Sequence, residues 1–539
     1  MTRPASRGIG LAAPLLWMLG LLGLAYALFR LHDFYQDDAF ISLTYARNLL
    51  AGDGLTWSGE KIEGYSNFLF VLLTAGLGGL GIDLVAAGRI VGAAFGIATV
   101  AAGLSLWGAA RKDSGTSLGA ASERALTGLY AFLLLTSVPL VAWSLGGLET
   151  TLFAFLVTMG VRSTLAAVGT GGGGPAVAGG AWFGLAVLAR PDGGVFWLAA
   201  LSFLAARAAT GRARALPALA CAAGALAVLV PYAAWKLWYF GDLVPNTWYA
   251  KSAGIPLAYK LRQGLAYLSS FIATPPALAL FAAAALVVRP LGAVRGSAVH
   301  LATWTSLVFF AYQLAVGGDF MAYFRFFAPL VPLLALIVVG VARELLACGR
   351  EALALALAGS IAVLGAAALV PLATAPGSAS ALVVEVAAPH IESEWSPGAL
   401  VAINASGALP YYRPDYRYVD MLGLNDRHIA RRSVTQPRGR VGHLKGDGDY
   451  VLGRAPDYLL LGFPYGAEEV EPVFLGDREI LADPRLATDY RKVTVALPVP
   501  RHLERRLAAV ADAYPSLRYA PGTLRFSYYE RAATATDER

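Results

Sequence analysis

Long apolar segments constrain this chain more strongly than any other feature of its sequence. Blocks of about 17–25 apolar residues recur up to about residue 374, and this is the length that crosses the hydrocarbon core of a bilayer. We therefore predict a mainly α-helical, polytopic membrane domain with about eleven transmembrane helices. The predicted spans are 11–29, 84–107, 125–145, 148–168, 176–190, 193–209, 215–238, 264–288, 298–316, 326–347 and 352–373.

The composition of the chain changes after about residue 374. Over its 539 residues, 57% are hydrophobic and 15% are charged, which is typical of membrane proteins. The remainder reads like a soluble domain, because short strand-like runs such as "LVAINAS" and "YLLLGF" alternate with polar stretches. We predict a membrane domain over residues 1–375 and a C-terminal α/β domain over residues 376–539.

Basic residues at the ends of the apolar blocks predict how the chain is oriented. They mark cytoplasmic loops, so the net charge of +7 reflects membrane topology and does not indicate a nucleic-acid partner. The apolar segment 66–81 is short and Gly-rich, and we predict a juxtamembrane or re-entrant helix there, since a full span would invert every later loop. The first outer loop (30–66) and the C-terminal domain then share the outer side. The cytoplasmic set is Arg3, Arg7, Arg111, Lys112, Arg124, Arg207, Arg212, Arg214, Arg289, Arg295, Arg343 and Arg350.

The first outer loop opens with "FYQDDAF", which puts Asp37 and Asp38 side by side at the start of a predicted short helix. Carboxylates at a helix N-terminus are stabilised by the helix dipole, which is one reason to find them there. A carboxylate can also act as a general base and take the proton from an acceptor hydroxyl. The sequence leaves both interpretations open, and it does not choose between the two residues.

Further polar residues of the predicted outer face stand in compact aromatic or glycine contexts. Ionisable residues at such depth are candidates for a functional site. Arg and Lys at a membrane surface suit a phosphate group, whereas "ARPDGG" is equally well explained by a salt bridge within a turn. The candidates are Glu63 and Tyr65 in "KIEGYSNFLF", Glu149 in "SLGGLETTLF", Arg190 and Asp192 in "ARPDGG", Asn246, Tyr249 and Lys251 in "YFGDLVPNTWYAKS", and Asp319 and Arg325 in "GGDFMAYFRFFAP".

These motifs carry a resemblance to a known superfamily. The segments "QDDAFISLTYARNLLAGDGL", "EGYSNFLF", "GGLETTLF", "LARPDG", "GDLVPNTWYAK", "GGDFMAYFRFFAP" and "VDMLGLNDRHIA" resemble those of GT-C membrane glycosyltransferases. Within that superfamily the chain resembles the mycobacterial arabinofuranosyltransferases that add terminal β-(1→2) arabinofuranose.

The resemblance implies a site and a reaction. Asp38 or Asp37 would be the catalytic base, and the reaction would invert the anomeric carbon. The phosphate of a polyprenyl-phosphate donor, such as decaprenyl-phosphoryl-arabinofuranose, would lie near Arg325 and Lys251, with Asn246 and Tyr249 beside them. The acceptor would be a cell-envelope glycan or glycoconjugate. The site would lie on the periplasmic side of a bacterial inner membrane and need neither metal nor cofactor. The remaining substrate contacts are assigned to Glu63, Tyr65, Glu149, Asp192 and Asp319.

Other functions stay open at this stage. A protein of the same fold could use another lipid-linked pentose or hexose. A transporter or flippase of lipid-linked sugars would place its charged residues at mid-membrane on broken helices, whereas here they gather at one face. A scaffold with an outer sensing domain would leave the paired aspartates idle. In "VDMLGLNDRHIA", a capped turn around Asn425 and Asp426 competes with contact to the acceptor glycan.

Overall fold

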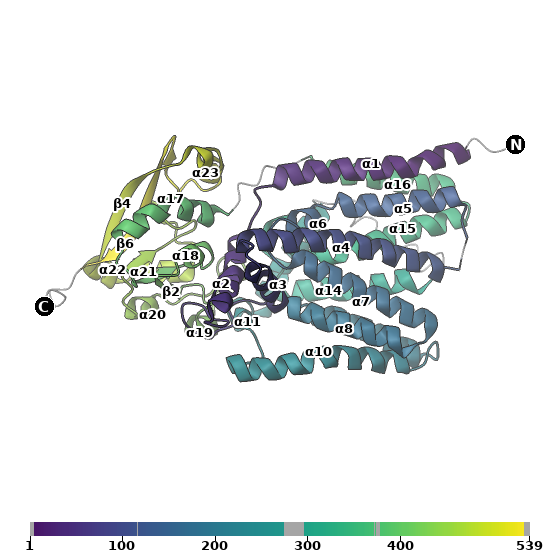
Figure 1. The fold of residues 1–539 in the computed structure, drawn as a ribbon, viewed down its shortest axis with the longest axis horizontal. Coiled ribbons are helices and arrows are strands. Elements are labelled where there is room, and N and C mark those ends of the chain that lie inside the picture. Colours follow the sequence, from purple (N-terminus) through teal and green to yellow (C-terminus); the bar gives the residue numbers. More distant parts are fainter. Residues whose placement is uncertain (1–4, 116, 274–295, 371, 373–377, 533–539) are drawn as a thin grey trace.

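The computed structural model describes residues 5–115, 117–273, 296–370, 372 and 378–532. These residues form a long helical bundle and, at one end of it, a smaller domain built on a sheet (Figure 1). The predicted domain boundary at 375 and 376 lies outside the described residues, as do Arg3, Arg289 and Arg295.

Among its described residues the bundle contains six helical segments that are long and apolar enough to cross a membrane: Ala12–Leu31, Leu84–Asp113, Thr150–Thr170, Leu216–Phe240, Ser297–Val316 and Ala322–Ala347. Shorter apolar helices lie among them, and together they make a multi-pass membrane protein. The bundle helices are α1 (Ala5–Leu31), α4 (Leu84–Asp113), α5 (Ala120–Leu135), α7 (Thr150–Thr170), α8 (Gly173–Ala189), α9 (Gly193–Ala209), α10 (Leu216–Phe240), α14 (Ser297–Val316), α15 (Val331–Ala347) and α16 (Glu351–Ala367).

Glycines allow two of these helices to approach closely. A Cβ atom on Gly180 of α8 would lie 2.0 Å from the Cys221 carbonyl oxygen of α10. A Cβ atom on Gly224 of α10 would lie 2.1 Å from the Val177 carbonyl oxygen of α8. Small residues facing each other in this way are how apolar helices pack in a membrane, where lipid competes with any hydrophobic attraction.

Three predicted spans differ from the observed helices. The span 125–145 is broken, since α5 ends at Leu135 and the short α6 (Val138–Trp143) begins beside Pro139, whose ring and missing N–H interrupt a helix. The span 326–347 starts inside a 3-10 segment, η2 (Ala322–Leu330), before α15. Of the span 264–288, the part up to Ala273 lies in α12 (Leu257–Ala273), and 274–288 lie outside the described residues.

Two helices lie where the bundle meets the C-terminal domain (Figure 1), one within the first outer loop and one directly after it. Helix α2 (Asp37–Ala51) ends at Gly52, whose φ of 90° is the left-handed conformation that favours glycine. Helix α3 (Phe68–Gly79) has 12 residues, which is too short to cross a bilayer. The segment 66–81 is therefore a short helix beside the bundle.

The C-terminal domain is a mixed sheet flanked by helices. The strand order is β2-β1-β3-β6-β4, with β1 parallel to β2 and β3, and with β6 antiparallel to β3, β4 and β5. The strands are β1 (Leu400–Ile403), β2 (Arg417–Asp420), β3 (Tyr458–Leu460), β4 (Tyr490–Pro498), β5 (Tyr519–Ala520) and β6 (Thr523–Arg531). The helices are α17 (Ala379–Glu394), α18 (Ala408–Tyr412), α19 (Arg427–Arg431), α20 (Gly448–Gly453), α21 (Leu475–Ala482), α22 (Pro484–Asp489) and α23 (Arg501–Ala513).

One apolar core runs from the first outer loop into the C-terminal domain. It includes Tyr45, Trp57 and Tyr65 of the loop together with Trp395 and Phe526 of the domain. This shared burial fixes the C-terminal domain against α2, so that the two parts form the walls of a common cavity.

Candidate functional site

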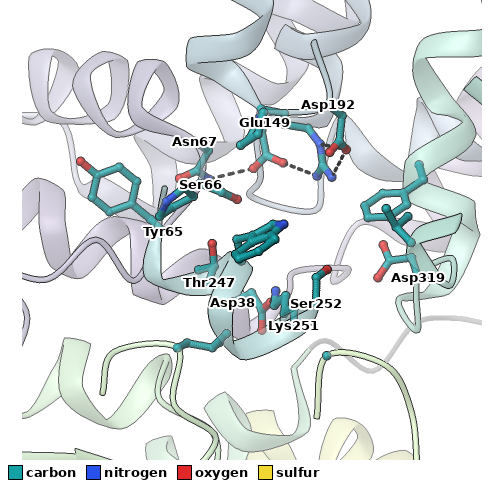
Figure 2. A pocket seen from close by; sticks show the side chains of 18 of the residues that line it. Asp38, Tyr65, Ser66, Asn67, Glu149, Asp192, Thr247, Lys251, Ser252 and Asp319 are labelled. Atoms are coloured by element: carbon teal, nitrogen blue, oxygen red, sulfur yellow. Dashed lines mark hydrogen bonds and ion pairs between the residues drawn. The ribbon is translucent and has the colours of Figure 1, made fainter. Parts of the chain in front are cut away.

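A cavity of about 490 Å³ lies where one end of the helical bundle meets the C-terminal domain. Its walls come from α2, the loop before α3, the α8–α9 turn, α11 (Asn246–Lys251) and the segment before α15, and Leu424, Val441 and Gly442 of the C-terminal domain complete it. Figure 2 shows the polar side chains that gather around it. The sequence-predicted residues on its walls are Asp38, Tyr65, Glu149, Arg190, Asp192, Lys251, Asp319 and Arg325.

The adjacent aspartates of α2 have different surroundings. Asp38 lines the cavity, and its Oδ2 lies 3.9 Å from the Lys251 ammonium nitrogen. Asp37 instead accepts hydrogen bonds from the backbone N–H groups of Gly407 and Ala408, both at 3.2 Å, at the start of α18. Burial, and then the charge of Asp38, raises the pKa of Asp37 to about 7. Asp37 thus joins α2 to the C-terminal domain, and Asp38 faces the cavity.

A buried ion network occupies the side of the cavity formed by the helical bundle (Figure 2). The Arg190 Nη1 lies 2.8 Å from Glu149 Oε1, and its Nη2 lies 2.7 Å from Asp192 Oδ2. Asn67 donates to the second oxygen of Glu149 at 2.8 Å, and Tyr312 donates to the second oxygen of Asp192 at 2.6 Å. Every carboxylate oxygen in the network therefore has a partner, as buried charges require, and the network ties α3, α7, α8 and α14 together.

Arg325 and Asp319 form a second pair on the cavity wall. Arg325 donates from Nε to Asp319 Oδ2 at 2.9 Å, and the other oxygen of Asp319 accepts from the backbone N–H of Phe320 at 2.9 Å. Just before Arg325, Tyr323 and Phe324 have φ values of 58° and 49°, which are costly for residues with a side chain. This strained turn sets the direction in which the Arg325 side chain leaves the backbone.

Two cations on the cavity wall have N–H donors that make no hydrogen bond within the described part of the chain. Within the described part of the chain, the Nη1 and Nη2 atoms of Arg325 have no hydrogen-bond partner, and the Lys251 ammonium has only the distant Asp38. Arg190, by contrast, is bound on all three nitrogens. A guanidinium fork and a lysine ammonium with free donors suit a phosphate group.

Glu63 does not line the cavity. Its carboxylate lies 2.7 Å from the Lys236 ammonium nitrogen, and both side chains are buried. This ion pair connects the first outer loop to the end of α10. Tyr65, which does line the cavity, packs its ring against Tyr45 at a centroid distance of 4.6 Å, and Figure 2 shows that ring directed away from Glu149 and Asp192.

Asn246 and Tyr249 of α11 also lie outside the cavity wall. Asn246 donates from Nδ2 to the carbonyl oxygens of Gly423 and Leu424, both at 2.9 Å. The Arg431 guanidinium stacks over the Tyr249 ring at 4.3 Å. Both side chains are therefore contacts between α11 and the C-terminal domain, and they fix the helix that carries Lys251.

The motif "VDMLGLND" folds into a turn around a buried carboxylate. Asp420 accepts from the backbone N–H and the side-chain Nδ2 of Asn425, at 2.8 and 3.0 Å. Asn425 in turn accepts from the Tyr45 hydroxyl at 3.0 Å, and Asp426 caps α19 through the Ile429 N–H. The capped turn expected for this motif is present, and it brings Leu424 to the cavity wall.

Sequence reasoning missed the contacts of some lining residues and missed other lining residues altogether. Asn67 and Arg190 stand inside the quoted motifs, and their buried carboxylate partners explain their positions. Trp248 and Ser252 belong to the α11 motif. Tyr312 lies within the apolar helix α14, where no local pattern marks it. Within the described ranges, no group of three His, Cys, Asp or Glu side chains is placed to hold a metal ion.

Comparison with known proteins identifies the fold of the chain. The family model of a domain of unknown function, DUF8728, matches residues 379–515. The crystal structure of ArnT from Cupriavidus metallidurans bound to undecaprenyl phosphate aligns over 95% of this chain and 97% of ArnT, with a TM-score of 0.52 and 12% identity. The apo ArnT structure aligns over the same shares, with a TM-score of 0.54 and 13% identity. No curated protein sequence matches the chain. The chain therefore has the GT-C fold.

Proposed function

We propose that this protein transfers a sugar from a polyprenyl-phosphate donor to a cell-envelope glycan or glycoconjugate, with Asp38 as the general base. One observation carries the proposal. Of the four carboxylates among the described cavity residues, only Asp38 has neither oxygen engaged in a hydrogen bond, whereas Glu149, Asp192 and Asp319 are held by arginines. A base must have an accessible lone pair for the proton it takes.

The geometry supports a direct displacement. The acceptor hydroxyl gives its proton to Asp38 as its oxygen forms the new bond to the anomeric carbon. The bond between that carbon and the phosphate oxygen breaks, and the electron pair leaves with the polyprenyl phosphate, which gains one negative charge. Attack opposite the leaving group inverts the anomeric carbon. The free donors of Arg325 and Lys251 stabilise the charge that develops on the phosphate.

Two observations support the class of donor. ArnT, which shares this fold, has been crystallised with undecaprenyl phosphate bound. The cavity of the present chain offers a guanidinium fork and an ammonium with free donors. We propose arabinofuranose as the transferred sugar on the strength of the sequence motifs, with another lipid-linked pentose or hexose as the alternative. The site would face the periplasm from the bacterial inner membrane.

Transfer by the purified protein tests this proposal. The full chain in nanodiscs would receive a synthetic polyprenyl-phosphoryl-arabinofuranose and a short arabinan acceptor, and the product would be followed by mass. We expect an acceptor that is heavier by one pentose. A panel of other polyprenyl-phosphate sugars runs in parallel, so transfer of a different sugar corrects the donor. Absence of transfer from the whole panel to arabinan and to extracted envelope glycans would contradict the proposal.

A further inference from the structure

Helix α12 lies beside the cavity and leaves one apolar face uncovered. Leu257, Leu261 and Leu265 are 58%, 43% and 59% exposed. Residues four apart share one face of a helix, so these leucines form a continuous apolar stripe. The side of the helix next to the stripe is packed, since a Cβ atom on Gly264 would lie 2.7 Å from the Leu314 carbonyl oxygen of α14. The exposure of the three leucines shows that the stripe itself is not covered by the protein.

Four cations gather around the first turns of this helix. Lys260 and Arg262 belong to α12 itself, and Arg438 and Arg440 belong to a loop of the C-terminal domain. Two contacts hold that loop against the helix. The Tyr259 hydroxyl donates to the Gly439 carbonyl oxygen, and Val441 and Lys260 both lie against Gly317. We call Lys260, Arg262, Arg438 and Arg440 the basic rim.

The charges of the basic rim are not compensated within the described part of the protein. None of its four side chains has an ion pair or a hydrogen bond there. Neighbouring arginines of the same domain behave differently, since Arg431 pairs with Asp242 at 3.2 Å and Arg432 pairs with Glu479 at 2.7 Å. Arg262, Arg438 and Arg440 are exposed, so the rim presents its charge outward. Such a cluster on the predicted outer side runs against the usual concentration of Lys and Arg in cytoplasmic loops.

We infer that the basic rim and the leucine stripe of α12 together bind acidic phospholipid headgroups. An amphipathic helix at a membrane surface buries its apolar face among acyl chains and places Lys and Arg at the level of the phosphates. Each such cation attracts anionic lipid. The rim adjoins the cavity, because the loop continues from Arg440 into Val441 and Gly442, which line it. An acidic lipid on the rim would sit next to the cavity wall. This inference does not depend on the proposed transfer reaction.

Lipid selectivity of the full-length protein tests the inference. The protein would be purified and reconstituted in nanodiscs with equal amounts of phosphatidylglycerol and phosphatidylcholine, and retained lipids would be counted by native mass spectrometry after mild delipidation. We expect retained lipid to be enriched in phosphatidylglycerol by about tenfold, and the enrichment to fall in high salt. Equal retention of the two lipids by the wild type would overturn the inference.

Matched variants locate the lipid. Arg438→Gln with Arg440→Gln should remove most of the enrichment, and Lys260→Gln with Arg262→Gln should do the same from the helix side. Arg438→Lys with Arg440→Lys should keep it, because charge rather than fork geometry attracts the lipid. The control is Arg501→Gln with Arg505→Gln on α23, which lies on the far side of the C-terminal domain from α11 (Figure 1) and removes the same charge. If the control loses as much enrichment as the rim variants, the selectivity comes from net charge and the inference is wrong.

Discussion

The ammonium nitrogen of Lys251 lies 3.9 Å from Oδ2 of Asp38, within ion-pair range but beyond hydrogen-bond distance. Both side chains are partly exposed, so their attraction is weak and neither is locked to the other. This separation lets Lys251 donate to a phosphate while Asp38 accepts a proton from a hydroxyl. The group proposed to bind the phosphate and the group proposed to act as the base are therefore neighbours on the cavity wall.

Replacing Lys251 tests whether this residue contacts the phosphate of the donor. Lys251→Gln should lower kcat/KM for the donor by about 10²-fold, because a charge that stabilises the leaving phosphate is lost. Lys251→Arg should recover part of the activity, since the positive charge remains. The measurement is steady-state kinetics with varied donor concentration, and Lys112→Gln at the end of α4, which does not line the cavity, serves as the control. Unchanged kinetics in Lys251→Gln would remove Lys251 from the site.

Arg325→Lys tests whether a guanidinium fork is needed. Lysine keeps the charge but loses the paired donors, so binding of polyprenyl phosphate should weaken by about tenfold or more. The measurement is competition of polyprenyl phosphate against a labelled lipid phosphate in detergent. Arg454→Lys, on the surface of the C-terminal domain, is the matched control and should bind like the wild type. Equal affinity in Arg325→Lys would show that no bidentate contact is made.

The buried ion pair of Glu63 and Lys236 can be tested through the stability of single and double variants. Removing one partner leaves an uncompensated buried charge, so Glu63→Gln or Lys236→Met alone should cost about 3–5 kcal/mol. The double variant should recover most of this loss, because both charges leave together. Unfolding transitions in detergent check the cycle. Additive losses in the double variant would mean that the two charges do not interact.

The raised pKa of Asp37 predicts that the stability of the protein depends on pH. Burial raises its pKa from 3.8 to about 7, so the folded state holds the proton more tightly than the unfolded state. Stability from this group is therefore fully present below pH 4 and is lost as the pH rises through 7. The melting temperature of the wild type should fall between pH 5 and 8 relative to Asp37→Asn. A difference that stays flat or grows with pH would mean that the Gly407 and Ala408 N–H groups stabilise the ionised form.

The sequence predicted much of the architecture because membrane spans and juxtamembrane helices follow local patterns. Block length placed most bundle helices, and the charge pattern identified 66–81 as a short helix. Local patterns failed where a break depends on a few residues, as at Pro139, which divides the expected span 125–145. They also missed Tyr312, whose place in the site depends on its contact with Asp192, which lies 120 residues earlier in the chain.

Individual roles within the site depend on partners far along the chain. Asp37 and Asp38 are equivalent in sequence. They are distinguished by α18, more than three hundred residues later, because the backbone N–H groups at its start donate only to Asp37. Asn246 and Glu63 stand in the same kind of outer motif as Lys251. Their partners, Leu424 and Lys236, become visible only when the chain is folded. The sequence motifs predicted which residues share one region of the fold. They did not distinguish the residues that line the cavity from those that hold its walls in place.

The most direct measurement compares Asp38→Asn with Asp37→Asn in the transfer assay. The proposal predicts that Asp38→Asn lowers kcat by about 10²–10⁴-fold while polyprenyl phosphate still binds, because a general base contributes about that much. Asp37→Asn should keep at least a substantial part of the activity, since its carboxylate meets α18 and not the cavity. Full transfer by a folded Asp38→Asn protein would contradict the proposal and place the base elsewhere.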